Sequence, residues 1–231
     1  MKLFAPLLAG ANLPDRLVGC VGATIAIALT IVVCAGLPLS TADLPIIVAP
    51  LGASAVLVFA VPSSPLAQPW PVVGGNTISS LVGVGAFHWV PDPTIAAGVA
   101  VGGAILVMSL LRCLHPPGGA AALTAVIGSQ SIHEAGYAFA FAPVAVNSIA
   151  LVSVAMFFHR VTAGNYPHVT SVVPAPALEA RFIASDIDAA LSDMHESFDI
   201  AREDIDSLLA HVERHARARA AVPPAGGASG R

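Results

Sequence analysis

The chain has 231 residues, of which 56% are hydrophobic and only 10% are charged, whereas a soluble domain usually carries about 25% charged residues. Residues 1–176 hold four basic and four acidic side chains, so the formal net charge of −4 belongs entirely to the remaining residues. These values exclude a basic nucleic-acid-binding protein and a disulfide-stapled secreted domain, and they indicate a membrane-embedded body with a charged tail.

The first residues, 1–11, bear a faint likeness to a signal peptide, because Lys2 precedes an apolar run that ends in Ala-x-Ala. The run is shorter than the roughly 15–30 residues of a secretory signal. Pro14, Asp15 and Arg16 lead directly from it into a longer apolar segment. We therefore expect residues 1–11 to be retained.

Uncharged runs divide the body into six apolar segments. A membrane-spanning helix needs about 20 predominantly apolar residues, and the run from Leu44 to Pro91 is long enough for two, separated by a proline-rich loop at 62–71. The predicted segments are 16–37, 44–61, 72–90, 94–112, 115–130 and 138–159. We expect an all-α membrane protein.

The charged residues of the body predict its orientation. If the N-terminus is cytoplasmic and all six segments cross, the four basic residues lie inside, and Asp43, Asp92 and Glu134 lie outside. If the second and fifth segments are instead re-entrant loops, leaving four crossings, Arg112 moves outside and Asp92 moves inside. The positive-inside rule favours six crossings with both termini cytoplasmic. Because no transit peptide precedes the body, we expect a bacterial inner membrane.

The second and fifth segments contain related motifs, PLGASAVL at 50–57 and PGGAAALT at 117–124, in which Pro, Gly and Ala coincide. The segments that follow them are also similar, with NTI at 76–78 and NSI at 147–149. Two matches in the same order predict a duplicated unit of three segments. An odd number of crossings inverts the second copy, so we expect two inverted repeats with broken helices.

Inverted repeats of this kind hold their site between the helix breaks, near the bilayer midplane. We expect both broken helices to begin there with free backbone N–H groups, whose partial positive charge suits a small anion. The alternative is that proline-kinked helices pack tightly and bind nothing. The predicted site residues are Pro50, Gly52, Ala53, Asn76, Thr77, His115, Pro117, Gly118, Gly119 and Asn147.

Individual polar residues of the body allow two interpretations each. His115 could donate to an anion or carry a proton, or it could brace the broken chain. Arg112 is either a snorkelling anchor at the interface or a substrate-binding cation. Interhelical hydrogen bonds explain the polar patch as well as substrate contact does; this patch comprises Asn76, Thr77, Ser79 and Ser80.

The sequence contains no pattern typical of an enzyme. The histidines lack metal-ligand spacing, and neither G-x-S-x-G nor G-x-G-x-x-G occurs. Cys20, Cys34 and Cys113 lie in apolar runs without metal or disulfide spacing. The apolar segments hold no acidic residue, which argues against a carboxylate-based pump. We expect no enzymatic activity, no cofactor and no metal.

The tail has a helical pattern, because apolar residues recur in alternating steps of four and three from Ile187 to Val212. This spacing is typical of a coiled coil. Two shorter helices, with Asp199 capping the second, are the competing interpretation. Either arrangement could join cytoplasmic tails into a homo-oligomer through 187–212. The predicted parts of the chain are a transmembrane domain (1–165), a proline-rich linker (166–177), a helical tail (178–221) and a disordered end (222–231).

The stretch LHPPGGA at 114–120 resembles the signature of the HPP family of integral membrane proteins, which is named for its His-Pro-Pro. Further similarity lies in APLGASA (49–55), PLAQPW (65–70) and GGNT (74–77), so the resemblance covers roughly 12–165 in order. It implies transport of nitrite, in which relatives from plastids and cyanobacteria are implicated. It also implies four transmembrane segments, as the family is usually described, against the six predicted from the residues.

These observations support two hypotheses of function. The first is a transporter or channel for a small inorganic anion, with nitrite implied by the family resemblance. Its expected partners are that anion, membrane lipids and further copies of the chain, and no nucleic acid. The alternative is a membrane scaffold or sensor that acts through its cytoplasmic helical tail.

Overall fold

The computed structural model describes residues 13–36, 47–162, 164–169, 184–194 and 199–221, and within these ranges it contains helices and no strand. Two compact units divide between His168 and Val169, a position inside the predicted linker 166–177. Each unit is therefore described by itself. The segment expected to be retained (1–11) and the end expected to be disordered (222–231) lie outside the described residues.

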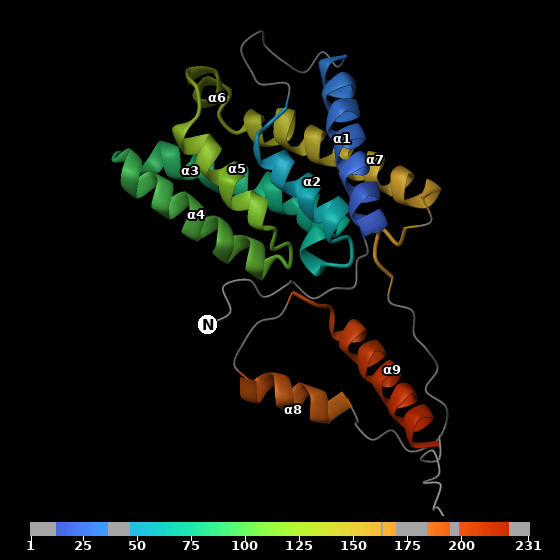
Figure 1. Cartoon of the computed structure of the whole chain (residues 1–231). Coiled ribbons are helices and arrows are strands. Elements are labelled where there is room, and N and C mark those ends of the chain that lie inside the picture. Colours follow the sequence, from blue (N-terminus) through green and yellow to red (C-terminus); the bar gives the residue numbers. More distant parts are fainter. Residues whose placement is uncertain (1–12, 37–46, 163, 170–183, 195–198, 222–231) are drawn as a thin grey trace, which may run out of the picture. The chain divides into compact units, whose positions relative to one another are not determined.

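The body contains a helix at the place of each predicted apolar segment (Figure 1). These helices are α1 (Leu13–Ala35), α2 (Pro50–Ala60), α3 (Asn76–Trp89), α4 (Pro93–Leu110), α5 (Pro116–Ile127) and α7 (Val146–Val161). Shorter elements connect them: the 3-10 helix η1 (Pro65–Ala67), the π-helical turns η2 (Pro71–Gly75) and η3 (Ala140–Ala145), and α6 (Gln130–Ala135).

Among the described residues, three helices are long and apolar enough to cross a membrane: Leu13–Ala35, Pro93–Leu110 and Ala140–Val161. The last of these joins η3 to α7 across a kink at Ala142. α2 and α5 are apolar but shorter. Many of the large apolar side chains on the long helices are exposed, including Leu17, Val21, Val32, Ile95, Leu106 and Phe157. Such surface is expected where hydrocarbon, not water, surrounds a helix.

Prolines set the starts of the two short helices. Pro50 is the first residue of α2, and Pro116 and Pro117 are the first two of α5. Proline suits this position because its fixed φ is helical and its missing N–H would have no partner in the first turn. Pro50 and Pro117 are buried, and α2 and α5 contact each other between α1 and α4 (Figure 1).

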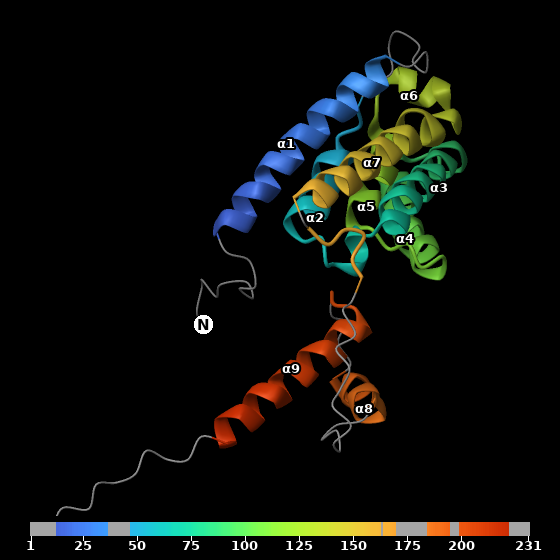
Figure 2. The same ribbon diagram turned by 90° about the vertical axis from the view of Figure 1, so that its right-hand side faces the viewer.

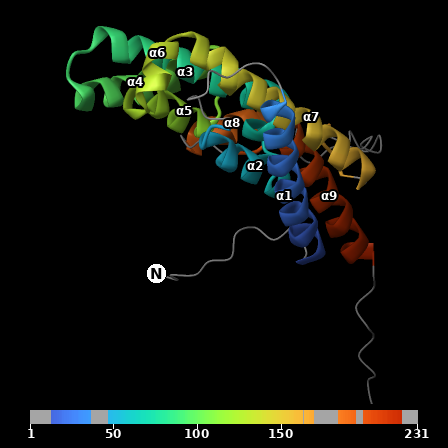
Figure 3. The ribbon, with the colours of Figure 1, turned by 90° about the horizontal axis from the view of Figure 1, so that it is seen from above.

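Small residues let the long helices approach closely. α1 packs against α2 and α7, whereas α4 packs against α3 and α5 (Figures 2 and 3). Lipid tails are as apolar as leucine, so helices in a membrane associate through close packing more than through hydrophobic burial. The buried positions of α4 follow a four-residue interval, and α1 has a similar stripe; they are Ala96, Ala100, Ala104 and Met108, and Gly19, Gly22, Ala26 and Thr30.

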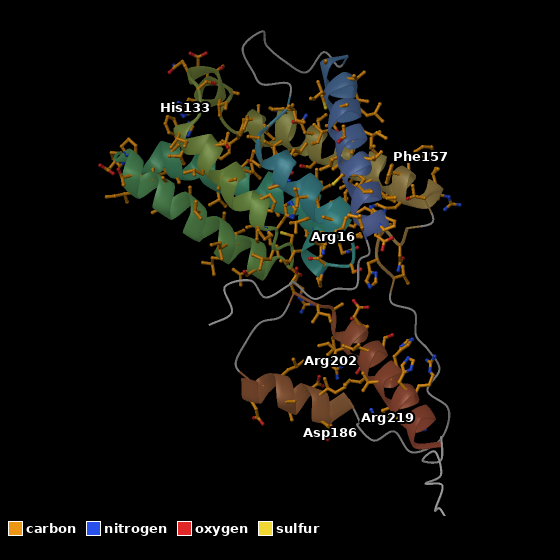
Figure 4. All side chains as sticks on the ribbon, viewed as in Figure 1. Arg16, His133, Phe157, Asp186, Arg202 and Arg219 are labelled. Atoms are coloured by element: carbon orange, nitrogen blue, oxygen red, sulfur yellow. The ribbon has the colours of Figure 1, made fainter. Side chains whose placement is uncertain are left out.

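The tail contains two helices, α8 (Ala184–Met194) and α9 (Arg202–Ala221). A single coiled-coil helix over 187–212 is therefore wrong, and two shorter helices are present. Arg202 of α9 (labelled in Figure 4) pairs with Asp188 of α8, with 2.7 Å between Nε and Oδ1. α9 begins three residues after Asp199, so this residue is not its N-cap. Phe198, one of the apolar residues in the predicted pattern from Ile187 to Val212, lies outside the described residues.

Gly83 of α3 allows a stability test of this packing. A Cβ added there would lie 2.9 Å from the backbone carbon of Ala122 in α5, whereas one added at Gly102 of α4 would meet nothing within 4 Å. We expect Gly83→Ala to destabilise the protein by about 1–3 kcal/mol, the usual effect of overpacking. Gly102→Ala is the matched control and should unfold with the wild type. Thermal unfolding in detergent measures both, and equal midpoints for the two variants would contradict the packing.

Candidate functional site

Four polar side chains from four elements meet inside the apolar body. They are Ser54 of α2, Asn76 at the start of α3, His115 just before α5, and Ser148 of α7, all 0% exposed. Asn76 Nδ2 donates to Ser54 Oγ (3.1 Å) and to Ser148 Oγ (3.2 Å). Ser54 Oγ in turn lies 2.8 Å from His115 Nε2. These four residues are called the Asn76 network below.

The carbonyl oxygen of Leu66 fixes the direction of the hydrogen bonds in this network. It lies 2.9 Å from His115 Nδ1, and because a carbonyl can only accept, Nδ1 carries a hydrogen. In a neutral imidazole the other nitrogen is then an acceptor. The Ser54 hydroxyl therefore donates to His115 Nε2 while it accepts from Asn76. Three of the bonds thus run in one direction, from Asn76 through Ser54 and His115 to Leu66, and Asn76 also donates to Ser148.

Several polar atoms beside the network lack a partner among the described residues. Asn76 Oδ1, Ser79 Oγ and Ser80 Oγ are buried and make no hydrogen bond. A buried polar group left unpaired costs about 1–3 kcal/mol, so such atoms call for an explanation such as a bound ligand or water. Ser79 and Ser80 lie on α3, one turn beyond Asn76. Their hydroxyls could donate hydrogen bonds to a bound anion.

The first turn of α5 covers one of these hydroxyls. A Cβ added to Gly118 would lie 2.7 Å from Ser79 Oγ and 2.9 Å from Met108 Sδ. Likewise, a Cβ on Gly75 would lie 2.6 Å from the Cβ of His115. Glycine at 118 is thus needed for α5 to approach α3 at the network.

Asn147 forms a second buried contact beside the network. Its Oδ1 accepts from the backbone N–H of Val48 (3.1 Å), and its Nδ2 donates to Cys34 Sγ (3.0 Å). Because Ser148 follows it directly, polar contacts continue from the Asn76 network to α1 and to the start of α2. Asn76 and Asn147 also share a local setting, since each lies at the start of a helix that follows a π-helical turn. Such turns are frequent at functional sites.

The expectation of free backbone N–H groups at the starts of α2 and α5 is wrong. The prolines at these starts have no N–H, and the next N–H groups donate to carbonyls of the preceding turn. These bonds are Leu51 to Val48 (3.0 Å), Gly52 to Ala49 (3.0 Å) and Gly118 to His115 (2.8 Å). Tight bonds of this type commonly satisfy helix ends. The donors free to bind a ligand here are therefore side chains.

The structure brings only some of the predicted site residues to the network. Asn76 and His115 belong to it, Asn147 and Gly118 adjoin it, and buried Pro50 places its carbonyl oxygen 3.3 Å from Ser54 Oγ. Pro117 is also buried, in the first turn of α5.

Other predicted site residues lie elsewhere. Gly52 and Ala53 are exposed on α2 and turn away from the network. Thr77 donates to Val73 within its own helix, with 2.7 Å between Oγ1 and the carbonyl oxygen. A Cβ on Gly119 would meet only Val101, at 3.9 Å. Arg112 is not one of the ten predicted site residues, but the sequence leaves it open as a substrate-binding cation; it is exposed, with a φ of 53°, where α4 ends.

Sequence reasoning missed Ser54. It is the sole polar side chain of α2 and lies four residues after Pro50, a spacing that puts both on one helical face. The sequence contains this signal, but the prediction relies on the proline and glycine of the motif at 50–57. Ser79 and Ser80 belong to the predicted polar patch but not to the predicted site.

Comparison with known proteins gives one family. The family model described as HPP, transmembrane region, matches residues 9–167. Two proteins of Dictyostelium discoideum, each named only as a transmembrane protein, are similar to the chain. One is 34% identical over 119 residues (50% of this chain and 41% of the relative), the other 37% over 112 residues (47% and 36%). The matches thus span about two fifths of these relatives. No solved structure matches.

The amide of Asn76 should contribute measurably to stability. Asn76→Leu keeps a similar size but removes the donor to the Ser54 and Ser148 hydroxyls, so we expect a loss of about 1–3 kcal/mol. Thr77→Val is the matched control, because its hydroxyl bonds only within its own helix. Unfolding midpoints in detergent decide the matter. If Asn76→Leu unfolds together with Thr77→Val, the network does not hold the helices together.

Proposed function

The chain belongs to the HPP transmembrane family, and from its buried polar site we propose that it is a transporter or channel for a small inorganic anion. One observation carries the proposal: unpartnered hydroxyls lie beside a hydrogen-bonded line of side chains inside an apolar body. Ser79 and Ser80 supply those hydroxyls, next to Asn76 and His115. A polar ligand is stabilised most where it supplies hydrogen-bond partners to buried polar groups that otherwise have none.

The chemistry of the site favours an anion over a cation. The elements that enclose it, α2, α3, α4 and α5, contain no carboxylate that could hold a cation. Hydroxyl hydrogens can instead converge on the oxygen or halide of a small anion. We propose nitrite as that anion because of the family resemblance carried by the motifs at 49–55, 65–70, 74–77 and 114–120.

We also propose that the body is two inverted repeats of three crossings. Each unit would have a long helix, a short helix that begins with proline, and a π-helical turn that leads into a third helix. The order is α1, α2 and η2–α3, then α4, α5 and η3–α7. The packing supports this pairing, because α1 contacts α2 and α7 as α4 contacts α5 and α3. Asn76 and Asn147 then occupy matching places.

We propose that both termini are cytoplasmic, as six crossings and the charges favour, and that the membrane is a bacterial inner membrane. The basic residues Arg16, Arg112 and Arg160 then lie on the inner side, whereas Asp92 and Glu134 lie on the outer side. This orientation agrees with the positive-inside rule, by which cytoplasmic loops of membrane proteins are enriched in Lys and Arg.

A second candidate function rests on the tail. Leu208 and Val212 of α9 are 57% and 54% exposed, and Ile200 is 38% exposed. An uncovered apolar face favours a homo-oligomer through 187–212, in a chain that acts as a membrane scaffold or sensor. Anion flux separates the two functions, since a chain without 178–221 keeps its flux if the body is the transporter.

Cysteine labelling tests the number of crossings. Ser63 and Ser129 are exposed on the loops that follow α2 and α5. Six crossings put these loops on opposite sides of the membrane, whereas re-entrant α2 and α5 put both on the same side. We expect a membrane-impermeant maleimide to label Ser129→Cys and spare Ser63→Cys in intact cells, in a chain whose native cysteines are replaced. Labelling of both would support four crossings.

Reconstitution tests transport itself. In proteoliposomes we expect nitrite uptake above that of protein-free vesicles, with nitrate, formate and chloride compared. Gly118→Ala should lower the rate at least about tenfold, because the new methyl group takes the space beside Ser79 and overpacks a tight contact. Gly98→Ala on α4 is the control, since its Cβ meets nothing within 4 Å. Wild-type protein that moves none of these anions would leave the tail function as the better proposal.

A further inference from the structure

Ser54 has two acceptors within reach, and this lets the site hold His115 in either charge state. Ser54 Oγ lies 2.8 Å from His115 Nε2 and 3.3 Å from the carbonyl oxygen of Pro50. With a neutral ring, the Ser54 hydroxyl donates to Nε2. With a proton on Nε2, the ring donates to Ser54 Oγ and the hydroxyl hydrogen turns to Pro50.

The remaining bonds of the network survive this change. A serine oxygen has two lone pairs, so Ser54 can accept from His115 and from Asn76 together. His115 Nδ1 donates to Leu66 in both states. One hydroxyl rotation therefore accommodates a proton without orphaning any of the bonded groups. If His115 only braced the chain, one of these two hydrogen-bond arrangements of Ser54 would be enough.

His115 is well placed to be the titrating group of the site. α2, η1, η2, α4 and α5 contain no titratable side chain. α3 contributes only His88, and α7 only His159 and Arg160, each in the last turn of its helix. On its own segment, His115 is preceded by the buried thiol of Cys113 and by exposed Arg112.

An anion inside this body would otherwise lack a compensating charge. Moving an ion from water into a low-dielectric interior carries a large free-energy cost unless it is paired or hydrogen-bonded. Hydroxyl donors meet part of that cost. A proton on His115 would supply the missing positive charge.

We infer that His115 takes up one proton with each anion, so that the chain is a proton–anion symporter in which the Ser54 hydroxyl switches between His115 and Pro50. This inference rests on the proposed transport of a small anion. The proton comes from water on one side, occupies Nε2 while the anion is bound, and leaves with the anion on the other side. The cycle moves no net charge across the membrane.

Proteoliposomes containing the full chain test this coupling with the membrane potential clamped. Uptake by protein-free vesicles is subtracted, because nitrous acid crosses lipid by itself. We expect an acidic outside, by one pH unit, to raise the protein-dependent initial rate of nitrite uptake severalfold, up to about tenfold, the free-energy equivalent of one pH unit. A clamped potential of either sign should leave that rate unchanged.

Two failures have distinct signatures. If nitrite uptake follows the potential and ignores the pH gradient, the anion moves alone, and the inference is overturned while transport stands. If no protein-dependent flux of nitrite, nitrate, formate or chloride occurs, the proposed transport itself is wrong, and the inference fails with it.

Variants locate the coupling. In Ser54→Ala and His115→Gln, the ratio of uptake rates with and without the gradient should fall to about one, whatever rate remains, because a difference in proton binding no longer drives uptake. His88→Gln is the control: this histidine also bonds a carbonyl through Nδ1 (Val84, 3.0 Å), but at the far end of α3. Full response to the gradient in both network variants would assign the coupling elsewhere. If neither variant folds, the wild-type measurement decides.

Discussion

A polar side chain inside a body surrounded by hydrocarbon has no bulk water to bind, and an amide that its own helix does not satisfy is best paired with polar groups of neighbouring helices. Asn76 meets this requirement by reaching Ser54 on α2 and Ser148 on α7 with one amide nitrogen. His115 then ties the start of α5 to α2 and to the carbonyl of Leu66. These bonds select which helices are neighbours, a choice that apolar surface alone leaves open when lipid is equally apolar.

Small residues make the same arrangement possible sterically. Gly75 and Gly118 leave no room for a Cβ where η2 and α5 pass the network, and Gly83 does the same farther along α3. The absence of side chains at these points brings polar atoms within bonding distance. Close packing and hydrogen bonding therefore depend on each other. The hydrogen bonds and tight contacts of the body offset the free-energy cost of burying the few unpaired hydroxyls.

The sequence indicated the positions of the helices well, because uncharged runs and prolines act locally. It predicted the short helices that begin with proline at 50 and at 116–117, and it singled out Asn76 and His115, which the structure joins in one network. It did not predict side-chain direction: Gly52 and Ala53 face outward and Ser54 inward, since the rotation of a helix about its axis is set by its neighbours. The expectation of free backbone N–H groups at the starts of α2 and α5 overlooks the fact that proline has no N–H. In the tail, the heptad pattern gives no sign that the helix is interrupted between α8 and α9, which the Arg202–Asp188 ion pair connects.

The π-helical turns have a consequence for how the chain can vary in evolution. A π turn is a helix with one extra residue, and each residue of a helix advances the following side chain by about 100° around the axis. η2 and η3 thus set the phase of the helices that begin at Asn76 and Val146. That phase depends on chain length, so a substitution within 71–75 leaves it unchanged, although Gly75 has no room for a Cβ beside His115. Loss of one residue there would rotate Asn76 out of register with its partners while leaving the composition almost unchanged.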